Sequence, residues 1–316
     1  MNRRERALAV FEGRKPDRVP TCFWHHFPDL YEQDMVDAHV NFYNSTSVDI
    51  LKMMCDEYFF YPIPEIKNAH DWAAMRPQGK NSRWIEGQVE RASQIVEALH
   101  GDVFSVYNVF APFSNLKHAY GDEQIMADLR ADEQAVRQAM DVIAEDNCIL
   151  LERILKETGV DGIFMIVQNA EASRFTEEEY KRIVQPGEER FIRCANELSR
   201  YNILHMCGWS GHKNRLELWK DYPAAVVNLA VYSEGMTLKQ GKEMFPDKAI
   251  MGGFDRNEGT LLHTGTPEEI RAETLRLVKE TGADRLIISA DCSLPTDVPY
   301  ENLRAVAEAL EECKDI

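Results

Sequence analysis

The sequence predicts a single α/β domain, spanning residues 1–316, that folds as a closed (β/α)8 barrel of the TIM type. Beyond residue 100, apolar runs of strand length alternate with amphipathic stretches of helix length, an order that is typical of parallel strands joined by helices. Eight apolar runs can be placed along the chain, and no linker rich in Pro, Gly or Ser divides them. Eight parallel strands suit closure into one barrel.

In chain order, the predicted strands lie near residues 19–24, 48–54, 103–109, 162–167, 203–207, 225–230, 249–253 and 285–290. A long helix is predicted over residues 132–158, and the segments that start at Thr176 and Thr266 begin with capping boxes. Residues 62–87 predict an insertion or an irregular excursion without a domain boundary. An open doubly wound sheet is the alternative, but the G-x-G-x-x-G motif that usually follows its first strand is absent.

The composition excludes several classes of partner. A formal net charge of -17 argues against nucleic acid and anionic membrane surfaces, which would repel the chain. No apolar stretch approaches the roughly 20 residues that span a bilayer, and the first residues lead into an amphipathic helix, so a cytoplasmic location is expected. Seven cysteines without the spacing of a small disulfide framework predict free thiols that can bind metal.

Three residues with soft donor atoms stand at predicted strand ends. His205 and Cys207 close the fifth strand, and Cys292 follows the eighth. Residues i and i+2 of a strand share a face, and the carboxyl ends of barrel strands meet at one mouth, so the three side chains are expected to bind one zinc ion. Three protein ligands leave a position open for chemistry. The alternatives are three unrelated core residues, or a redox pair between Cys207 and Cys292.

Several segments resemble one known family. They are RRERA at 3–7 with GRKPDRVP at 13–20, MGGFD at 251–255 with GTPEE at 265–269, and PYENL at 299–303. With these, nearly the whole chain resembles the uroporphyrinogen decarboxylase superfamily, and within it the methylcobamide:coenzyme M methyltransferase-like branch. That branch carries His-x-Cys and a distant Cys, which match His205, Cys207 and Cys292.

The resemblance implies a zinc- and corrinoid-dependent methyltransferase. Zinc would bind a small thiol as a thiolate and present it to a methylated corrinoid carried by a separate corrinoid-binding protein, or the enzyme would demethylate a small methylated compound onto the corrinoid. The decarboxylase branch uses a pair of arginines after the first strand, where this chain reads TCFWHHFP at 21–28. A decarboxylase of a porphyrinogen-type acid and a non-catalytic zinc- or corrinoid-binding protein are the alternatives. A homodimer is considered for the assembly.

Further site residues are assigned around this centre. Asp56 resembles the active-site aspartate of the decarboxylases, and Glu171 follows the fourth strand; both are predicted to be catalytic, although each could instead cap a helix or pair with a cation. His25, Asn169 and Tyr232 are assigned to contacts with the cofactor. At most one of His25 and His26 should face the site, because adjacent residues on extended chain point in opposite directions. Glu171 and Glu234 are also candidates for a fourth zinc ligand or a proton-handling base.

Overall fold

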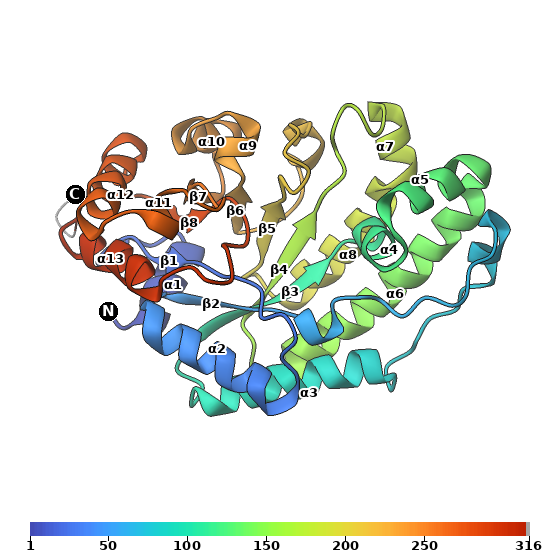
Figure 1. Ribbon diagram of the computed structural model, residues 1–316, viewed down its shortest axis with the longest axis horizontal. Helices are drawn as coiled ribbons and strands as arrows, with labels where there is room; N and C mark the ends of the chain where they lie inside the picture. Colours follow the sequence, from blue (N-terminus) through green and yellow to red (C-terminus); the bar gives the residue numbers. More distant parts are fainter. Residues whose placement is uncertain (314–316) are drawn as a thin grey trace.

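Eight parallel strands form a nearly closed barrel in the computed structural model, which describes residues 1–313 (Figure 1). The strands are β1 (Thr21–Cys22), β2 (Ile50–Met53), β3 (Phe104–Phe110), β4 (Gly162–Val167), β5 (Ile203–Met206), β6 (Val226–Leu229), β7 (Ala249–Phe254) and β8 (Leu286–Ala290). Hydrogen bonding runs from β1 through β8 and down to β2. A backbone hydrogen bond of 3.0 Å from Asp49 N to Thr21 O links β1 to the segment before β2. The predicted (β/α)8 barrel is confirmed, and each strand lies within or next to its predicted range.

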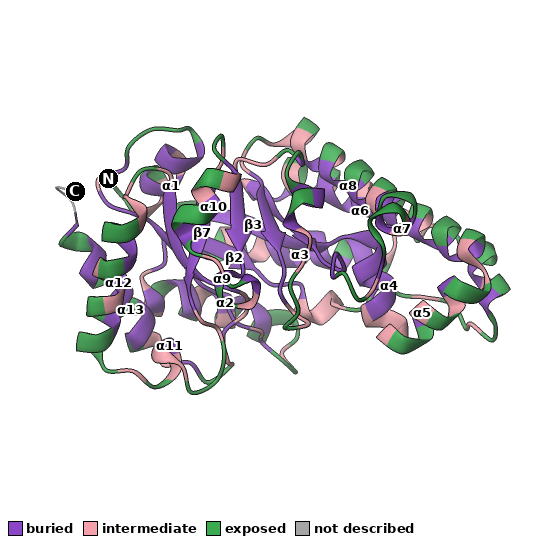
Figure 2. Cartoon of the chain, turned by 90° about the horizontal axis from the view of Figure 1, so that it is seen from above, coloured by how far each residue is buried: buried purple, intermediate pink, exposed green. Residues whose placement is uncertain are grey.

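Helices surround the barrel, and their polar faces are exposed while the strands are fully buried (Figure 2). The larger helices are α1 (Arg3–Phe11), α2 (Glu32–Thr46), α3 (Arg83–Ala98), α4 (Pro112–Tyr120), α5 (Asp122–Ala131), α6 (Glu133–Glu157), α7 (Glu177–Ile183), α8 (Gln185–Leu198), α10 (Leu238–Met244), α12 (Pro267–Thr281) and α13 (Tyr300–Glu311). Helix α6 fills the predicted range 132–158, and the capping boxes at Thr176 and Thr266 are present.

Residues 62–87, the predicted insertion or irregular excursion, have little regular structure before α3 begins. This segment contains the short helix η2 (Ala69–Ala74), which packs against α6. The fully buried Trp72 of η2 donates a hydrogen bond to Asp128 on α5 at 2.8 Å. The buried carboxylate of Asp146 on α6 accepts hydrogen bonds from Tyr61 Oη at 2.6 Å, Gln78 N at 2.7 Å and Gly79 N at 3.0 Å. The Asp146 carboxylate thus accepts hydrogen bonds from backbone N–H groups that belong to no strand or helix, and it ties the irregular segment to α6.

The amino-terminal ends of β1 and β2 are tied by a buried charge cluster. Asp49, fully buried, accepts hydrogen bonds from Arg6 Nη1 at 2.6 Å, Arg18 Nη1 at 2.9 Å and Thr21 N at 2.9 Å. Burial of a carboxylate is costly unless cations and donors surround it, as they do here. The cluster joins α1 to the seam where the barrel closes.

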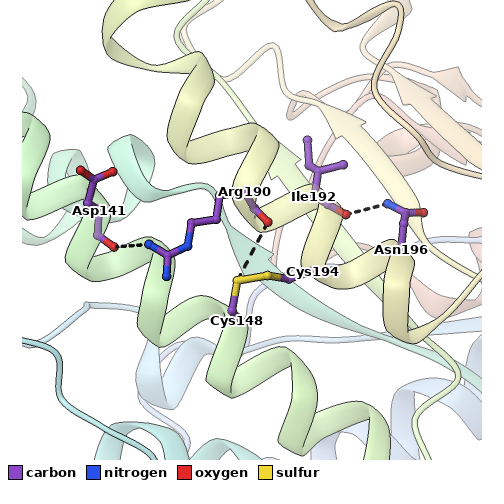
Figure 3. Close-up of a disulfide and its surroundings, with 6 residues drawn as sticks. All are labelled: Asp141, Cys148, Arg190, Ile192, Cys194 and Asn196. Atoms are coloured by element: carbon purple, nitrogen blue, oxygen red, sulfur yellow. Dashed lines mark hydrogen bonds between the residues drawn. A yellow bond between two sulfur atoms is a disulfide. The ribbon is translucent and has the colours of Figure 1, made fainter.

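Two of the seven cysteines form a disulfide, which corrects the expectation that the thiols are free. Cys148 on α6 and Cys194 on α8 are bonded across the helix pair, with Cα atoms 5.7 Å apart (Figure 3). The five free cysteines are Cys22, Cys55, Cys207, Cys292 and Cys313.

None of the helices formed by residues 1–313 is long and apolar enough to cross a bilayer.

Candidate metal centre

Three side chains with soft donor atoms meet at the carboxyl ends of β5 and β8. His205 lies on β5, Cys207 follows it, and Cys292 stands two residues beyond β8. The three ligand atoms lie within 4.8 Å of one another: the two sulfurs are 3.8 Å apart, and Cys292 Sγ is 3.5 Å from His205 Nε2. The structure therefore brings the three predicted ligands into one group that could hold a metal ion. Within residues 1–313, no carboxylate joins this group.

Asn228 on β6 sets the orientation of the His205 ring. Register pairs the two residues across β5 and β6, and His205 Nδ1 is hydrogen-bonded to Asn228 Oδ1. The amide nitrogen of Asn228 donates to Met251 O at 3.1 Å and Ala290 O at 3.3 Å, so its oxygen must face the ring. Nδ1 therefore carries a proton, and Nε2 faces the sulfurs, where it could bind a metal ion.

The two cysteines lie close enough to change each other's pKa. A hydrogen bond from Cys207, together with the nearby His205 and Lys52, holds the pKa of Cys292 below its usual range, although burial opposes this. The same hydrogen bond and burial raise the pKa of Cys207. A soft cation that enters the site would bind both sulfurs as thiolates and displace the protons that they carry.

A cavity of about 680 Å³ opens directly over these three residues. Its wall includes His26, Lys52, Asn108, His118, Gln168 and Trp209. Three polar atoms of this wall are buried without a hydrogen-bond partner among the described residues: Asn108 Oδ1, His118 Nε2 and Trp209 Nε1. Buried polar atoms are usually paired, so their presence marks this wall as one that a polar ligand can complete.

Asp56 does not line the cavity itself but contacts His26, which does. Its carboxylate accepts from Phe27 N at 2.7 Å and pairs with His26 Nδ1 at 2.7 Å, and His26 lines the cavity. Burial raises the pKa of Asp56, but the contact with His26 outweighs it and leaves the pKa lowered. His25 points away, with hydrogen bonds to His26 O at 2.6 Å and Tyr300 Oη at 2.9 Å, so His26 rather than the predicted His25 faces the site.

Glu171, Asn169 and Tyr232 lie outside the lining of the metal cavity. Glu171 is buried beside Arg174, whose Nε is 3.5 Å from its carboxylate, and both line a separate depression. Asn169 is buried and accepts from Lys117 Nζ at 3.3 Å. Tyr232 is exposed on α9 (Val231–Glu234), in a groove beside α10 and α12.

Glu234, the other acidic candidate, accepts hydrogen bonds from the backbone and side chain of Asn214. Burial raises the pKa of Glu234. It therefore serves to hold the loop after β5, and it does not join the three ligands.

Sequence reasoning missed Lys52, Asn108 and Asn228, although a signal was present. Each is a polar residue inside a strand that is mostly apolar, and such a residue on a buried strand must point toward a partner or a cavity. Lys117 and Trp209 carried no comparable signal. The Lys117 ammonium lies 3.5 Å from the centre of the Trp209 ring, and burial lowers its pKa to about 7.

The fold and the site define a class of protein: a parallel barrel with three soft donor atoms grouped at the carboxyl ends of its strands. The sequence profile described as uroporphyrinogen decarboxylase (URO-D) matches residues 61–313, and the chain belongs to this family. The predicted family is therefore confirmed. No curated protein matches the sequence significantly.

Solved structures with the same fold share little sequence with this chain. A methyltransferase from Methanosarcina mazei is 16% identical with a TM-score of 0.76, and 99% of each chain is covered. A B12-independent methionine synthase from Shewanella sp. W3-18-1 is 16% identical with a TM-score of 0.58, and 95% of each chain is covered. Endo-glycoceramidase II from Rhodococcus sp. is 9% identical with a TM-score of 0.52 over 93% of this chain and 80% of that one. At these identities the likeness concerns the fold alone.

Proposed function

We propose that the protein is a zinc-dependent methyltransferase that moves a methyl group between a corrinoid and a small thiol. The observation that carries this proposal is the convergence of His205 Nε2, Cys207 Sγ and Cys292 Sγ beneath a cavity at the barrel mouth. Two thiolates and an imidazole are soft donors that suit zinc, and three protein ligands leave a fourth position for a substrate. The match to the methyltransferase-like branch of the family supports the same reaction.

The spacing of the donors agrees with zinc. Tetrahedral coordination with Zn–S bonds of about 2.3 Å and Zn–N bonds of about 2.0 Å requires sulfurs about 3.8 Å apart and a sulfur-to-nitrogen distance of about 3.5 Å. The observed separations are 3.8 Å between the sulfurs and 3.5 Å from Cys292 Sγ to His205 Nε2. The third pair, Cys207 Sγ and His205 Nε2, lies within 4.8 Å, so closure around a zinc ion would draw these two atoms together by at most about 1.3 Å.

Zinc held there would supply Lewis acidity, keeping an added thiol as its thiolate near pH 7. The chain itself would position the reactants. The His205 ring is fixed by Asn228, and the cavity lies over the ligands on the open side of the barrel. A corrinoid brought by a partner protein would cover this mouth, aligning its methyl group with the sulfur and excluding water. The same geometry serves transfer in either direction.

The test combines metal analysis with a methyl-transfer assay. Plasma mass spectrometry on the wild type should find near-stoichiometric zinc, and Cys207→Ser and Cys292→Ser should lose both the metal and the transfer of methyl from methylcobalamin to a thiol. Cys313→Ser is the matched control, because this buried cysteine lies near the end of α13 and away from the cavity.

Activity that survives removal of the metal would refute the mechanism. Turnover of uroporphyrinogen would instead favour a decarboxylase. Tight zinc and corrinoid binding with no transfer in either direction would favour a non-catalytic binding protein.

A further inference from the structure

Lys52 places an ammonium group inside the barrel without an acidic partner. The residue lies on β2 and is 3% exposed, and its Nζ stands 4.3 Å from the centre of the Trp24 ring and 4.1 Å from that of Phe164. Both rings also pack against His205, with ring centroids 5.9 and 5.2 Å apart. Across residues 1–313, Lys52 Nζ makes no hydrogen bond or ion pair, and the residue lines the cavity above the metal ligands.

The nearest ionisable groups to this ammonium are cysteines. Cys22, Cys55, Cys207 and Cys292 all interact with Lys52 electrostatically, and Cys292 has the largest effect. Burial raises the pKa of Cys22 and of Cys55 to about 12, so both thiols are neutral near pH 7. Cys207 and Cys292 line the same cavity as Lys52, and together with His205 they form the group that could hold a metal ion.

A divalent metal bound to this group would leave it with a net positive charge. Cysteine binds metal as thiolate and histidine as neutral imidazole, so the divalent ion, two thiolates, the imidazole and the Lys52 ammonium sum to one positive charge. A third thiolate would return the sum to zero. Because uncompensated charge inside a protein is costly, the loaded site should favour an anionic ligand over a neutral one.

We infer that Lys52 is the counter-charge for the sulfur of a small thiol that joins the metal as its fourth ligand. The inference rests on the proposed function, because it concerns the same metal and the same thiol. In the binding step the S–H bond of the thiol breaks, its proton leaves to the buffer, and a sulfur lone pair forms the bond to the metal. Lys52 does not carry that proton. It stabilises the negative charge that remains, and it is therefore a positioning residue.

Binding to the Co²⁺-loaded protein tests this role without any methyl transfer. The cobalt absorption bands report each ligand, and the three probes are 2-mercaptoethanol, 3-mercaptopropionate and imidazole. Lys52→Met should weaken both thiols by roughly 10- to 100-fold, the loss expected for one charge pair at intermediate dielectric, and should leave neutral imidazole within about twofold. Lys52→Arg should retain most of the thiol affinity.

Lys248→Met is the matched control. Lys248 is a half-buried lysine beside the Phe245 ring, at the amino-terminal end of β7 and so at the opposite end of the barrel. Replacing it makes the same change in net charge and should alter none of the three affinities. Removal of an unpaired buried charge should leave the fold intact in Lys52→Met, and circular dichroism checks this.

Four results would overturn the inference. Unchanged thiol affinity in Lys52→Met would remove the role altogether. A loss confined to 3-mercaptopropionate would mean that Lys52 contacts a carboxylate, and an equal loss for imidazole would mean that it holds the ligands in place. Failure of the wild type to bind Co²⁺ would overturn the inference and the proposed function together, whereas absent methyl transfer with intact thiol binding would remove only the proposed function.

Discussion

Loss of the Cys148–Cys194 disulfide should lower the free energy of unfolding by about 4 kcal/mol. The bond closes a loop between residues 46 positions apart, and chain-entropy arguments give roughly 3 kcal/mol for a loop of 15 residues and roughly 4.7 kcal/mol for one of 100. The native state should change little, because α6 and α8 contact each other extensively besides the bond that Figure 3 shows. The loss should therefore arise mainly in the unfolded chain.

Urea unfolding measures this loss in the Cys148→Ser, Cys194→Ser double variant and in the wild type with and without a reductant. The reduced wild type should approach the double variant, and the reductant should have no effect on that variant. The activity of the folded protein should stay unchanged, because the bond lies on the outer helix layer and away from the cavity. A loss below about 1 kcal/mol would refute the reasoning, since it would mean that the loop is already constrained in the unfolded state.

Two further predictions concern buried polar groups. Asn228→Ala should weaken zinc binding by about 10- to 100-fold in a competition with a chelator, because the His205 ring loses the partner that fixes its tautomer; unchanged affinity would show that other contacts orient the ring. Burial raises the pKa of Glu188 to about 8 despite hydrogen bonds from Tyr180 and Tyr222. The folded state therefore favours the protonated carboxyl group. This contribution to the free energy of unfolding is complete below about pH 4.5 and is lost as the pH rises to 8, by roughly 1.4 kcal/mol per pH unit. Urea unfolding at several pH values should show this fall in the wild type but not in Glu188→Gln, and parallel profiles would exclude the assignment.

The barrel could be predicted because its strands are continuous apolar runs between amphipathic helices. The predicted range 162–167 coincides with β4, and 203–207 exceeds β5 by one residue. The prediction is least accurate for the first strand, which is expected over residues 19–24 but covers only Thr21–Cys22. This strand is short because its open edge meets the segment before β2 through the backbone hydrogen bond from Asp49 N to Thr21 O.

The grouping of His205, Cys207 and Cys292 could be predicted because two rules act together: i and i+2 share a face, and the ends of barrel strands share a mouth. The disulfide could not, since the pairing of Cys148 with Cys194 depends on how α6 packs against α8 and leaves no trace in spacing. Neither could the choice between the two adjacent histidines, which depends on where Asp56 and Tyr300 lie in space.

Polar residues inside the strands provide information that the loops do not. A parallel strand is buried on both faces, so a lysine or an amide within it must find a partner or face a cavity. Register places Asn228 beside His205, and each residue satisfies the other. Lys52 has no such partner among residues 1–313, although it stands above aromatic rings that also contact His205. Cysteines packed in an ordinary core would not need a buried cation beside them. An unpaired ammonium in the same cavity wall as His205, Cys207 and Cys292 therefore supports the proposal that this site binds a metal and then an anion.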